Sequence, residues 1–269
     1  SENVKLREFA MSKKIALAMA IGALSLSAYA TETASPVEST KDLKDLKVIS
    51  SQMKEYFGGD IANYVAETEI PNVYLVTLND GTNMIYFKDT KFAVVGDMYD
   101  LKAKKNMTRS LLSGYNAEIL NTFKDKGIHF PATKTDKGVE TLYVFTDPTC
   151  GYCRKLHNEK DQYNAAGINL VYLPYSRSGE GSFSYNELVD VYCSGDRKAA
   201  LDLAKSDKGE EIKKMPTYKI EDSCKNEVKE AQEAGQRLGV SGTPALFTAD
   251  GHFFPGYIEA SKLRGYIEE

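Results

Sequence analysis

The feature that most restricts the fold of this chain is a pair of cysteines separated by two residues, Cys150-Gly-Tyr-Cys153. The preceding run, residues 141–146, is apolar and β-rich, which is typical of a buried strand. We expect a helix from Cys150 to about Ala166. Free backbone N–H groups and the positive dipole at a helix start favour a thiolate on Cys150. One helical turn places Cys153 beneath it, close enough for a disulfide.

Other sites that use a Cys-x-x-Cys pair fit this sequence less well. A c-type haem site needs histidine directly after the second cysteine, where this chain has Arg154. A zinc site needs two further ligands at matching spacing, but Cys193 and Cys224 do not form a second such pair and the histidines are scattered. An inert structural disulfide stays open as an alternative, although so short a loop at a helix start is more often redox-active. We therefore predict a redox-active Cys150–Cys153 disulfide, with no metal or other cofactor.

A substrate-binding surface is expected around this pair. Gly151 keeps the turn tight, and Tyr152 can shield one side of it. Thr243-Pro244 lies about 90 residues downstream, at the start of an apolar run. Pro244 is either a plain turn proline or follows a cis peptide bond that exposes backbone groups of Thr243 to an extended peptide. We assign Gly151, Tyr152, Thr243 and Pro244 to substrate binding.

The two other cysteines, Cys193 and Cys224, flank a stretch of helical pattern. They form either a structural disulfide, which loop entropy makes worth about 3–4 kcal/mol, or a second redox pair. The structural disulfide is the favoured interpretation. His157, in the helix expected after the first pair, either lies on a solvated helix face or modulates Cys150 electrostatically; we favour the solvated face.

The N-terminal segment has the three parts of a secretory signal peptide. Lys13 and Lys14 precede an apolar run at 15–28, and small residues stand at the −3 and −1 positions of a cut after Ala30. A transmembrane anchor would need about 20 apolar residues. We expect residues 1–10 to be an upstream extension or tag, 11–30 to be the signal peptide, and the protein to work in an oxidising compartment.

Apolar periodicity divides the rest into two units of the α+β class. Residues 31–101 are expected to hold a helix at 43–57 and strands at 73–78, 83–87 and 92–95. So small a sheet leaves its edges open, and a second copy is the simplest partner, which predicts a homodimer. Residues 102–138 are expected to form a linker helix with no strand beside it. Residues 139–269 alternate strand and helix patterns, which predicts a mixed sheet covered on both faces.

Charge and composition exclude other classes. The net charge is −4, without a long basic run, which argues against a nucleic-acid partner. The hydrophobic fraction is 42% and the charged fraction 27%, so the composition is that of a globular protein and not of a disordered or membrane-embedded one.

Four segments together resemble the DsbC/DsbG family of bacterial periplasmic disulfide isomerases. They begin at Val95, Val144, Gly239 and Pro255 and read VGDMYD, VFTDPTCGYCRKLH, GVSGTPA and PGY. The resemblance runs from about residue 42 to the end. The chain departs from the family at Arg154, where familiar members have histidine, and in a longer segment between its last two cysteines.

The resemblance implies a fold and a set of roles. The fold would be a V-shaped homodimer of cystatin-like N-terminal modules, linker helices and thioredoxin-like domains with a helical insert. Cys150 would be the attacking thiol and Cys153 the resolving thiol, Pro244 would be cis, and Cys193–Cys224 would be a structural disulfide. The implied partners are misfolded, disulfide-containing exported proteins and the membrane reductase DsbD, in the periplasm.

Three functions follow in order of preference. The first is an isomerase that rearranges incorrect disulfides and also acts as a chaperone. The second is an oxidase that donates disulfides, although a donor does not need the dimer that the N-terminal module suggests. The third is a DsbG-like chaperone or sulfenic-acid reductase.

Overall fold

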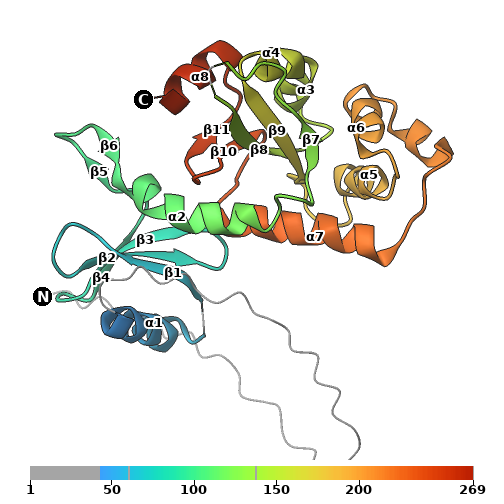
Figure 1. Ribbon diagram of the computed structural model, residues 1–269. Helices are drawn as coiled ribbons and strands as arrows, with labels where there is room; N and C mark the ends of the chain where they lie inside the picture. Colours follow the sequence, from blue (N-terminus) through green and yellow to red (C-terminus); the bar gives the residue numbers. More distant parts are fainter. Residues whose placement is uncertain (1–42, 60, 137, 269) are drawn as a thin grey trace, which may run out of the picture. The chain divides into compact units, whose positions relative to one another are not determined.

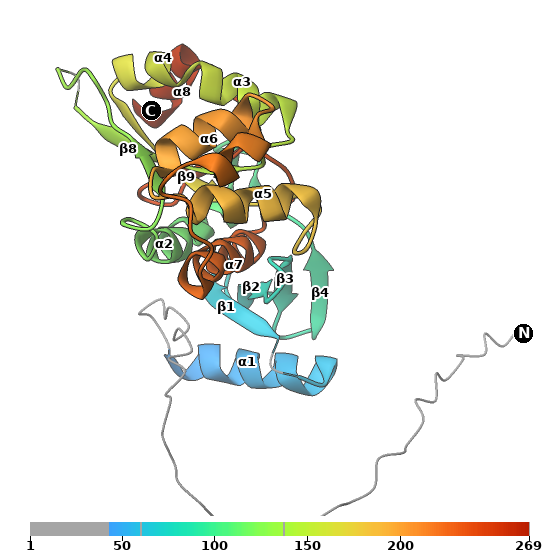
Figure 2. The same cartoon turned by 90° about the vertical axis from the view of Figure 1, so that its right-hand side faces the viewer.

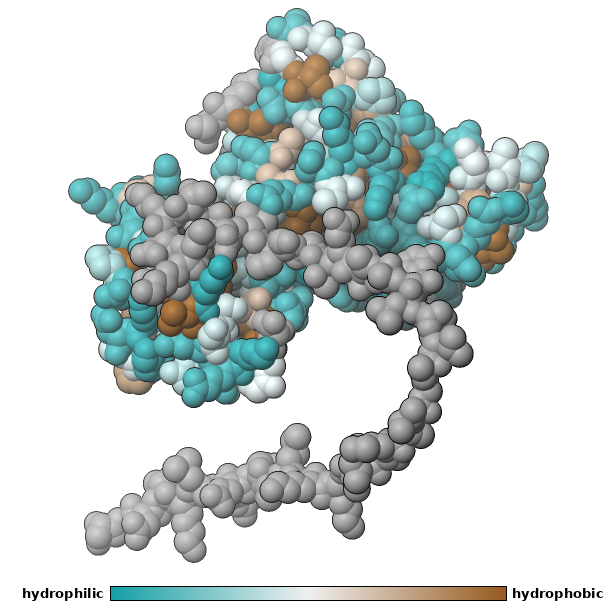
Figure 3. Space-filling view, turned by 60° about the horizontal axis from the view of Figure 1, so that its bottom comes forward, coloured by the Kyte–Doolittle hydropathy of each residue, from teal (hydrophilic) through white to brown (hydrophobic). Residues whose placement is uncertain are grey.

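The computed structural model describes residues 43–59, 61–136 and 138–268 (Figure 1). The predicted upstream extension, signal peptide and cleavage site after Ala30 lie outside these residues. No helix among the described residues is long and apolar enough to cross a membrane. On the side drawn in Figure 3, the coloured surface is mainly hydrophilic and its hydrophobic residues lie in small separate groups.

The N-terminal part is a helix on one face of a four-stranded antiparallel sheet. Its elements are α1 (Leu43–Phe57), β1 (Ala62–Glu67), β2 (Val73–Leu78), β3 (Asn83–Phe87) and β4 (Phe92–Val95), with the strands in that order across the sheet. Buried side chains of α1 pack against alternate residues of β2 and β3: Ile49, Met53, Tyr74, Val76, Met84 and Tyr86. The predicted helix and the three predicted strands are confirmed.

Strand β1 has no counterpart among the predicted elements. Its sequence, Ala-Asn-Tyr-Val-Ala-Glu, contains several residues of low strand propensity. Its pairing with β2 also shifts register between Ala62 and Tyr64. Pairing with a neighbouring strand therefore supplies the stability that local propensity does not.

The segment predicted as a linker helix contains strands as well as a helix. α2 (Met107–Asn121) forms as expected, and the Asn106 side chain caps it by accepting the backbone N–H of Arg109. A two-stranded ribbon, β5 (Tyr99–Asp100) and β6 (Lys105–Asn106), precedes α2, and β7 (Ile128–Phe130) follows it. The expectation of a helix with no strand beside it is therefore wrong. Because β7 joins the C-terminal sheet, that sheet begins inside the stretch predicted as linker.

The C-terminal sheet is mixed, as predicted. It contains β8 (Glu140–Thr146), β9 (Ile168–Pro174), β10 (Ala245–Thr248) and β11 (Phe253–Pro255), in the order β11-β10-β8-β9-β7. The central strands β8 and β9 are parallel, and the other pairs are antiparallel. Parallel strands bring their carboxyl ends to the same edge of a sheet, and the residues that follow them can therefore share a site.

Helices cover both faces of this sheet (Figures 1 and 2). They are α3 (Gly151–Asn158), α4 (Lys160–Ala165), α5 (Phe183–Tyr192), α6 (Arg197–Lys205), α7 (Asp222–Arg237) and α8 (Ala260–Glu268), with the 3₁₀ helix η1 (Gly209–Lys214) after α6. Side chains of β8 alternate between two buried clusters. Leu142 and Val144 pack with residues of α3 to α6 and α8, whereas Tyr143 and Phe145 pack with residues of α2 and α7.

Candidate functional site

The cysteines of the Cys-Gly-Tyr-Cys segment lie at the junction of β8 and α3. β8 ends at Thr146, a short turn follows, and α3 begins at Gly151 with Cys150 as its N-cap residue, at φ −86° and ψ 121°. The Cys150 carbonyl accepts the backbone N–H of Arg154 at 3.0 Å. Cys150 therefore stands at the N-terminus of α3, next to the backbone N–H groups that the first helical turn leaves without intrahelical partners.

Both cysteines are free thiols, and their environments differ. Cys150 exposes 5% of its surface, and its Sγ lies 3.2 Å from the Thr243 carbonyl, to which it donates only when protonated. A hydrogen bond from Cys153 lowers the pKa of Cys150 to about 5, against the opposing effect of burial. Thr243, the backbone N–H of Cys153 and the Arg177 guanidinium act in the same direction.

The inner thiol has the opposite character. Cys153 is fully buried. Burial raises the pKa of the Cys153 thiol well above its ordinary range, and the hydrogen bond to Cys150 raises it further. The pair therefore consists of one thiolate near the surface and one protonated thiol behind it, which is the asymmetry that thiol–disulfide exchange requires.

Asp147 and Arg177 hold the turn in front of α3. The Asp147 carboxylate accepts the backbone N–H and the hydroxyl of Thr149, at 2.8 and 2.7 Å. It also accepts the backbone N–H and Nε of Arg177, at 3.0 and 3.2 Å. Burial raises the pKa of Asp147, but these hydrogen bonds outweigh it and lower the pKa overall. The ionised pair fixes the turn and keeps a guanidinium near Cys150.

The structure brings the predicted substrate-binding residues to this thiol. The Thr243–Pro244 peptide bond is cis, and Thr243 contacts Cys150. Gly151 is exposed beside Cys150, and Tyr152 is 64% exposed. The Tyr152 ring stacks on Tyr257, with ring centroids 6.1 Å apart. An extended peptide at this surface would reach the Cys150 thiolate between the start of α3 and the residues that lead into β10.

Asp147, Arg177 and Lys205 were not identified from the sequence. Asp147 and Arg177 follow the carboxyl ends of the parallel strands β8 and β9, so a sequence argument that paired these two apolar runs could have found them. Lys205 gave no such signal, because it belongs to α6 and only the tertiary fold buries it near the cysteines.

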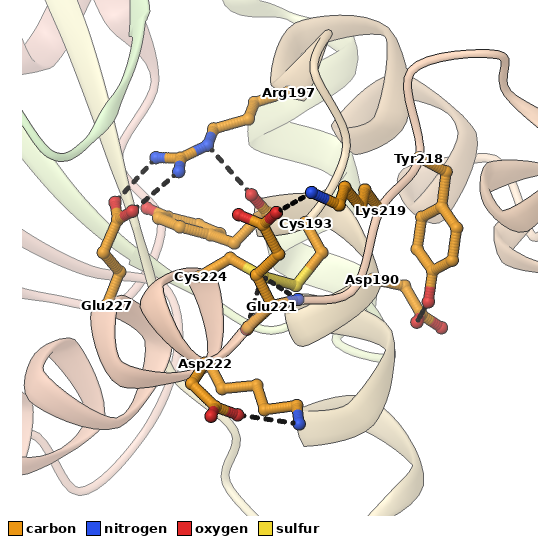
Figure 4. The surroundings of a disulfide bond; sticks show 11 residues. Asp190, Cys193, Arg197, Tyr218, Lys219, Glu221, Asp222, Cys224 and Glu227 are labelled. Atoms are coloured by element: carbon orange, nitrogen blue, oxygen red, sulfur yellow. Dashed lines mark hydrogen bonds and ion pairs between the residues drawn. A yellow bond between two sulfur atoms is a disulfide. The ribbon is translucent and has the colours of Figure 1, made fainter.

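Cys193 and Cys224 form a disulfide between the end of α5 and the first turn of α7 (Figure 4). Their Cα atoms are 5.2 Å apart, and both residues are buried. Beside them, Arg197 makes two hydrogen bonds of 2.8 Å to the Glu227 carboxylate. The burial of both cysteines supports the structural role over a second redox pair, because exposed disulfides are the more easily reduced ones.

His157 does not lie on a solvated helix face, so that expectation is wrong. Only 2% of it is exposed, and its Nε2 lies 2.6 Å from Asp202 Oδ1 of α6. Burial lowers the pKa of His157 to about 4, although the bond to Asp202 opposes this. His157 is therefore a neutral side chain at the contact of α3 with α6. Among the described residues, no group of three or more His, Cys, Asp or Glu side chains could hold a metal ion.

Comparisons with known proteins agree on one family. A family model described as a thioredoxin-like domain matches residues 132–269. The chain is 34% identical to the thiol:disulfide interchange protein DsbC of Salmonella typhimurium strain LT2, over 76% of this chain and 82% of that protein. It is 32% identical to the DsbC of Escherichia coli strain K12, over 74% and 79%. With the DsbC of Haemophilus influenzae the identity is 30%, over 78% and 86%.

Proposed function

Because the chain belongs to the DsbC family of thiol:disulfide interchange proteins, we propose that it rearranges incorrect disulfides in exported proteins through Cys150 and Cys153. The observation that carries this proposal is the unequal pair of thiols. Cys150 has a lowered pKa at a helix start, and Cys153 is protonated and buried behind it.

The proposed reaction starts with the Cys150 thiolate. Its sulfur attacks one sulfur of a substrate disulfide, a mixed disulfide forms, and the other substrate sulfur leaves as a thiolate. A different substrate thiolate then attacks the mixed disulfide, which creates a new pairing and releases Cys150 unchanged. Isomerisation therefore consumes no electrons. When no substrate thiol arrives, Cys153 attacks Cys150, the Cys150–Cys153 disulfide forms, and the substrate leaves as a reduced dithiol.

The surface around Cys150 supports binding of an extended polypeptide. Backbone groups of Thr243 stand opposite the thiol, so a substrate strand can pair there while its disulfide reaches Sγ. Exposed Tyr152 supplies an aromatic contact that does not depend on substrate sequence. This tolerance suits an enzyme that must accept many misfolded chains.

The proposal includes a setting and partners. The signal-like segment at 11–30 supports a periplasmic location for the mature protein, a compartment where disulfides persist. A homodimer joined through the N-terminal sheets would set two active sites around one cleft and give chaperone activity. A Cys150–Cys153 disulfide would be inactive as an isomerase, so a membrane reductase such as DsbD must keep the pair reduced.

Recovery of activity from scrambled ribonuclease tests this function. Catalytic amounts of the reduced protein should restore ribonuclease activity, and Cys150→Ala should restore none. An oxidase would instead form disulfides in reduced ribonuclease but leave the scrambled enzyme inactive. A chaperone or sulfenic-acid reductase would suppress aggregation without rearranging disulfides. Either of these results would reject the isomerase.

A further inference from the structure

Lys205 is a buried cation behind the Cys-Gly-Tyr-Cys turn, and the exchange reaction described above does not use it. It is the last residue of α6, and 3% of it is exposed. Its Nζ donates to Thr146 Oγ1 at 2.6 Å and to the Asp147 carbonyl at 2.9 Å. Both acceptors are neutral, and no carboxylate of the described residues pairs with this ammonium. Burying a charge without a counter-ion costs folding free energy, so a buried ammonium at this position suggests a functional role.

The group that needs this charge is Cys153. The Asp147 backbone contacts both residues: its carbonyl accepts from Lys205, and its N–H donates to the Cys153 sulfur, which lowers the pKa of that thiol. Lys205 is the charge that most favours a Cys153 thiolate, and Cys153 is the charge that most favours an ammonium on Lys205. Burial lowers the pKa of Lys205 to about 8. Both groups are buried behind the turn, and each favours the charged form of the other.

The other ionisable groups around Lys205 have partners elsewhere, or burial shifts their pKa towards the neutral form. They are Asp147 from the turn, Cys150, Arg154 and His157 from α3, and Glu187 from α5. Asp147 pairs with Arg177, and Arg154 pairs with Asp207. Burial disfavours charge on His157 and Glu187. Cys150 is a thiolate that receives hydrogen bonds of its own, whereas Cys153 must become an anion only during resolution.

We propose that Lys205 is a positioning residue for resolution, a buried ammonium that stabilises the Cys153 thiolate; the inference rests on the exchange reaction proposed above. Cys153 releases its proton to water, and its sulfur attacks Cys150 Sγ of the mixed disulfide. The Cys150–Cys153 bond forms as the bond from Cys150 to the substrate sulfur breaks. The substrate sulfur leaves as a thiolate and takes up a proton. The cysteine pair is oxidised by two electrons, and the substrate disulfide is reduced by two.

Two-step release of thionitrobenzoate separates this step from the first attack. When the reduced full-length protein is mixed with 5,5′-dithiobis(2-nitrobenzoate), Cys150 releases the first thionitrobenzoate, and Cys153 releases the second. Lys205→Met keeps an unbranched side chain of similar length and removes its charge. If the thiolate fraction of Cys153 falls about 100-fold, each remaining thiolate is more basic and attacks about eightfold faster. The rate of the second phase should therefore fall roughly tenfold at pH 7. The first phase should stay within about threefold of wild type.

The pH profile distinguishes this role from a structural one. The difference between wild type and Lys205→Met should narrow above about pH 8, because Lys205 itself loses its proton there. Lys198→Met, an exposed lysine on the same helix, is the matched control and should leave both phases unchanged. If the Lys205→Met protein does not fold, Lys205→Gln supplies a second uncharged variant. We expect the same slow second phase from it.

Each result bears on a different claim. A second phase in the uncharged variants that matches wild type at every pH would overturn the role of Lys205, even if the melting temperature changed. A wild-type protein that releases no thionitrobenzoate in a fast first phase would instead overturn the proposed role of Cys150.

Discussion

At neutral pH the Cys150 side chain is almost entirely thiolate, because its pKa lies near 5. About 99% is ionised at pH 7, compared with about 3% for an ordinary thiol, which is a gain of about 30-fold. Intrinsic nucleophilicity falls with pKa, and the loss over this range is roughly 40-fold. The two effects nearly cancel, so the rate of attack changes little. The lowered pKa instead makes Cys150 a good leaving group and favours its release from mixed disulfides.

Ultraviolet absorbance of the thiolate at 240 nm should follow this ionisation. In the reduced protein we expect a transition with its midpoint near pH 5. The folded pKa lies below the unfolded one, so this thiolate stabilises the reduced fold fully above about pH 8.5, and the contribution disappears as pH falls through 5. Cys153→Ala should move the midpoint upward, because it removes the first-ranked hydrogen bond to Cys150. Cys150→Ala is the control without a transition, and a wild-type midpoint near 8.5 would contradict the assignment.

The buried position of Cys153 predicts a different phenotype for its removal. Cys153→Ala keeps the attacking thiol but cannot release a stalled mixed disulfide, so adducts with substrate proteins should accumulate. Non-reducing electrophoresis of the variant, incubated with scrambled ribonuclease, would show them as bands that disappear on reduction. Cys150→Ala/Cys153→Ala is the matched control. A reactive Cys150 in the single variant without any adduct would contradict the resolving role of Cys153.

At the scale of elements, α6 supports the active-site helix from behind. Lys205 reaches the turn before α3, Asp202 lies 2.6 Å from His157, and Asp207, just after α6, pairs with Arg154 at 2.5 Å. α6 lies between Cys193 and Cys224, within the loop that their disulfide closes. The helical insert is therefore part of the support of the site.

Removal of this disulfide should reduce stability and spare exchange. Cys193→Ser/Cys224→Ser opens a loop whose closure is worth about 3.7 kcal/mol by chain entropy. For a chain of this size that corresponds to a melting temperature lower by roughly 7–15 °C, measurable by circular dichroism. Well below that temperature, thionitrobenzoate release should match wild type. Loss of thiol–disulfide exchange without loss of stability would instead show that Cys193 and Cys224 act as a redox relay.

The elements that could be predicted from the sequence are those with strong local patterns. β8 and β9 read as continuous apolar runs, and α1 has clear helical periodicity. β1 and β7 are short or poor in strand formers, and neighbouring strands stabilise them. In the site, the cysteines and Thr243-Pro244 could be identified from the sequence as motifs. Lys205 and the burial of His157 were not, because α6 reaches the site only through tertiary packing.

At the scale of the whole molecule, β4 is an edge strand with an apolar surface. All four of its residues are exposed, with Phe92 at 71%, Val94 at 57% and Val95 at 68%. Among the strands of the described residues it pairs with β3 alone, so within this part of the chain the backbone groups along its other side are available to a further strand. Exposed apolar edge strands promote association unless they are covered. This edge is therefore a suitable site for the homodimer that we propose.

Val94→Lys should separate the subunits, because it places a charge on this apolar edge. Analytical ultracentrifugation should show a monomer, whereas Ile220→Lys, which changes an equally exposed apolar residue outside the sheet, should leave the dimer intact. The thiols are untouched, so thionitrobenzoate release should stay within about twofold of wild type. Isomerisation of scrambled ribonuclease should fall about tenfold or more, because a monomer has no second active site that can hold the unfolded chain while the first one reacts. A Val94→Lys protein that remains dimeric would place the interface elsewhere, and a monomer with full isomerase activity would show that the reaction needs no dimer.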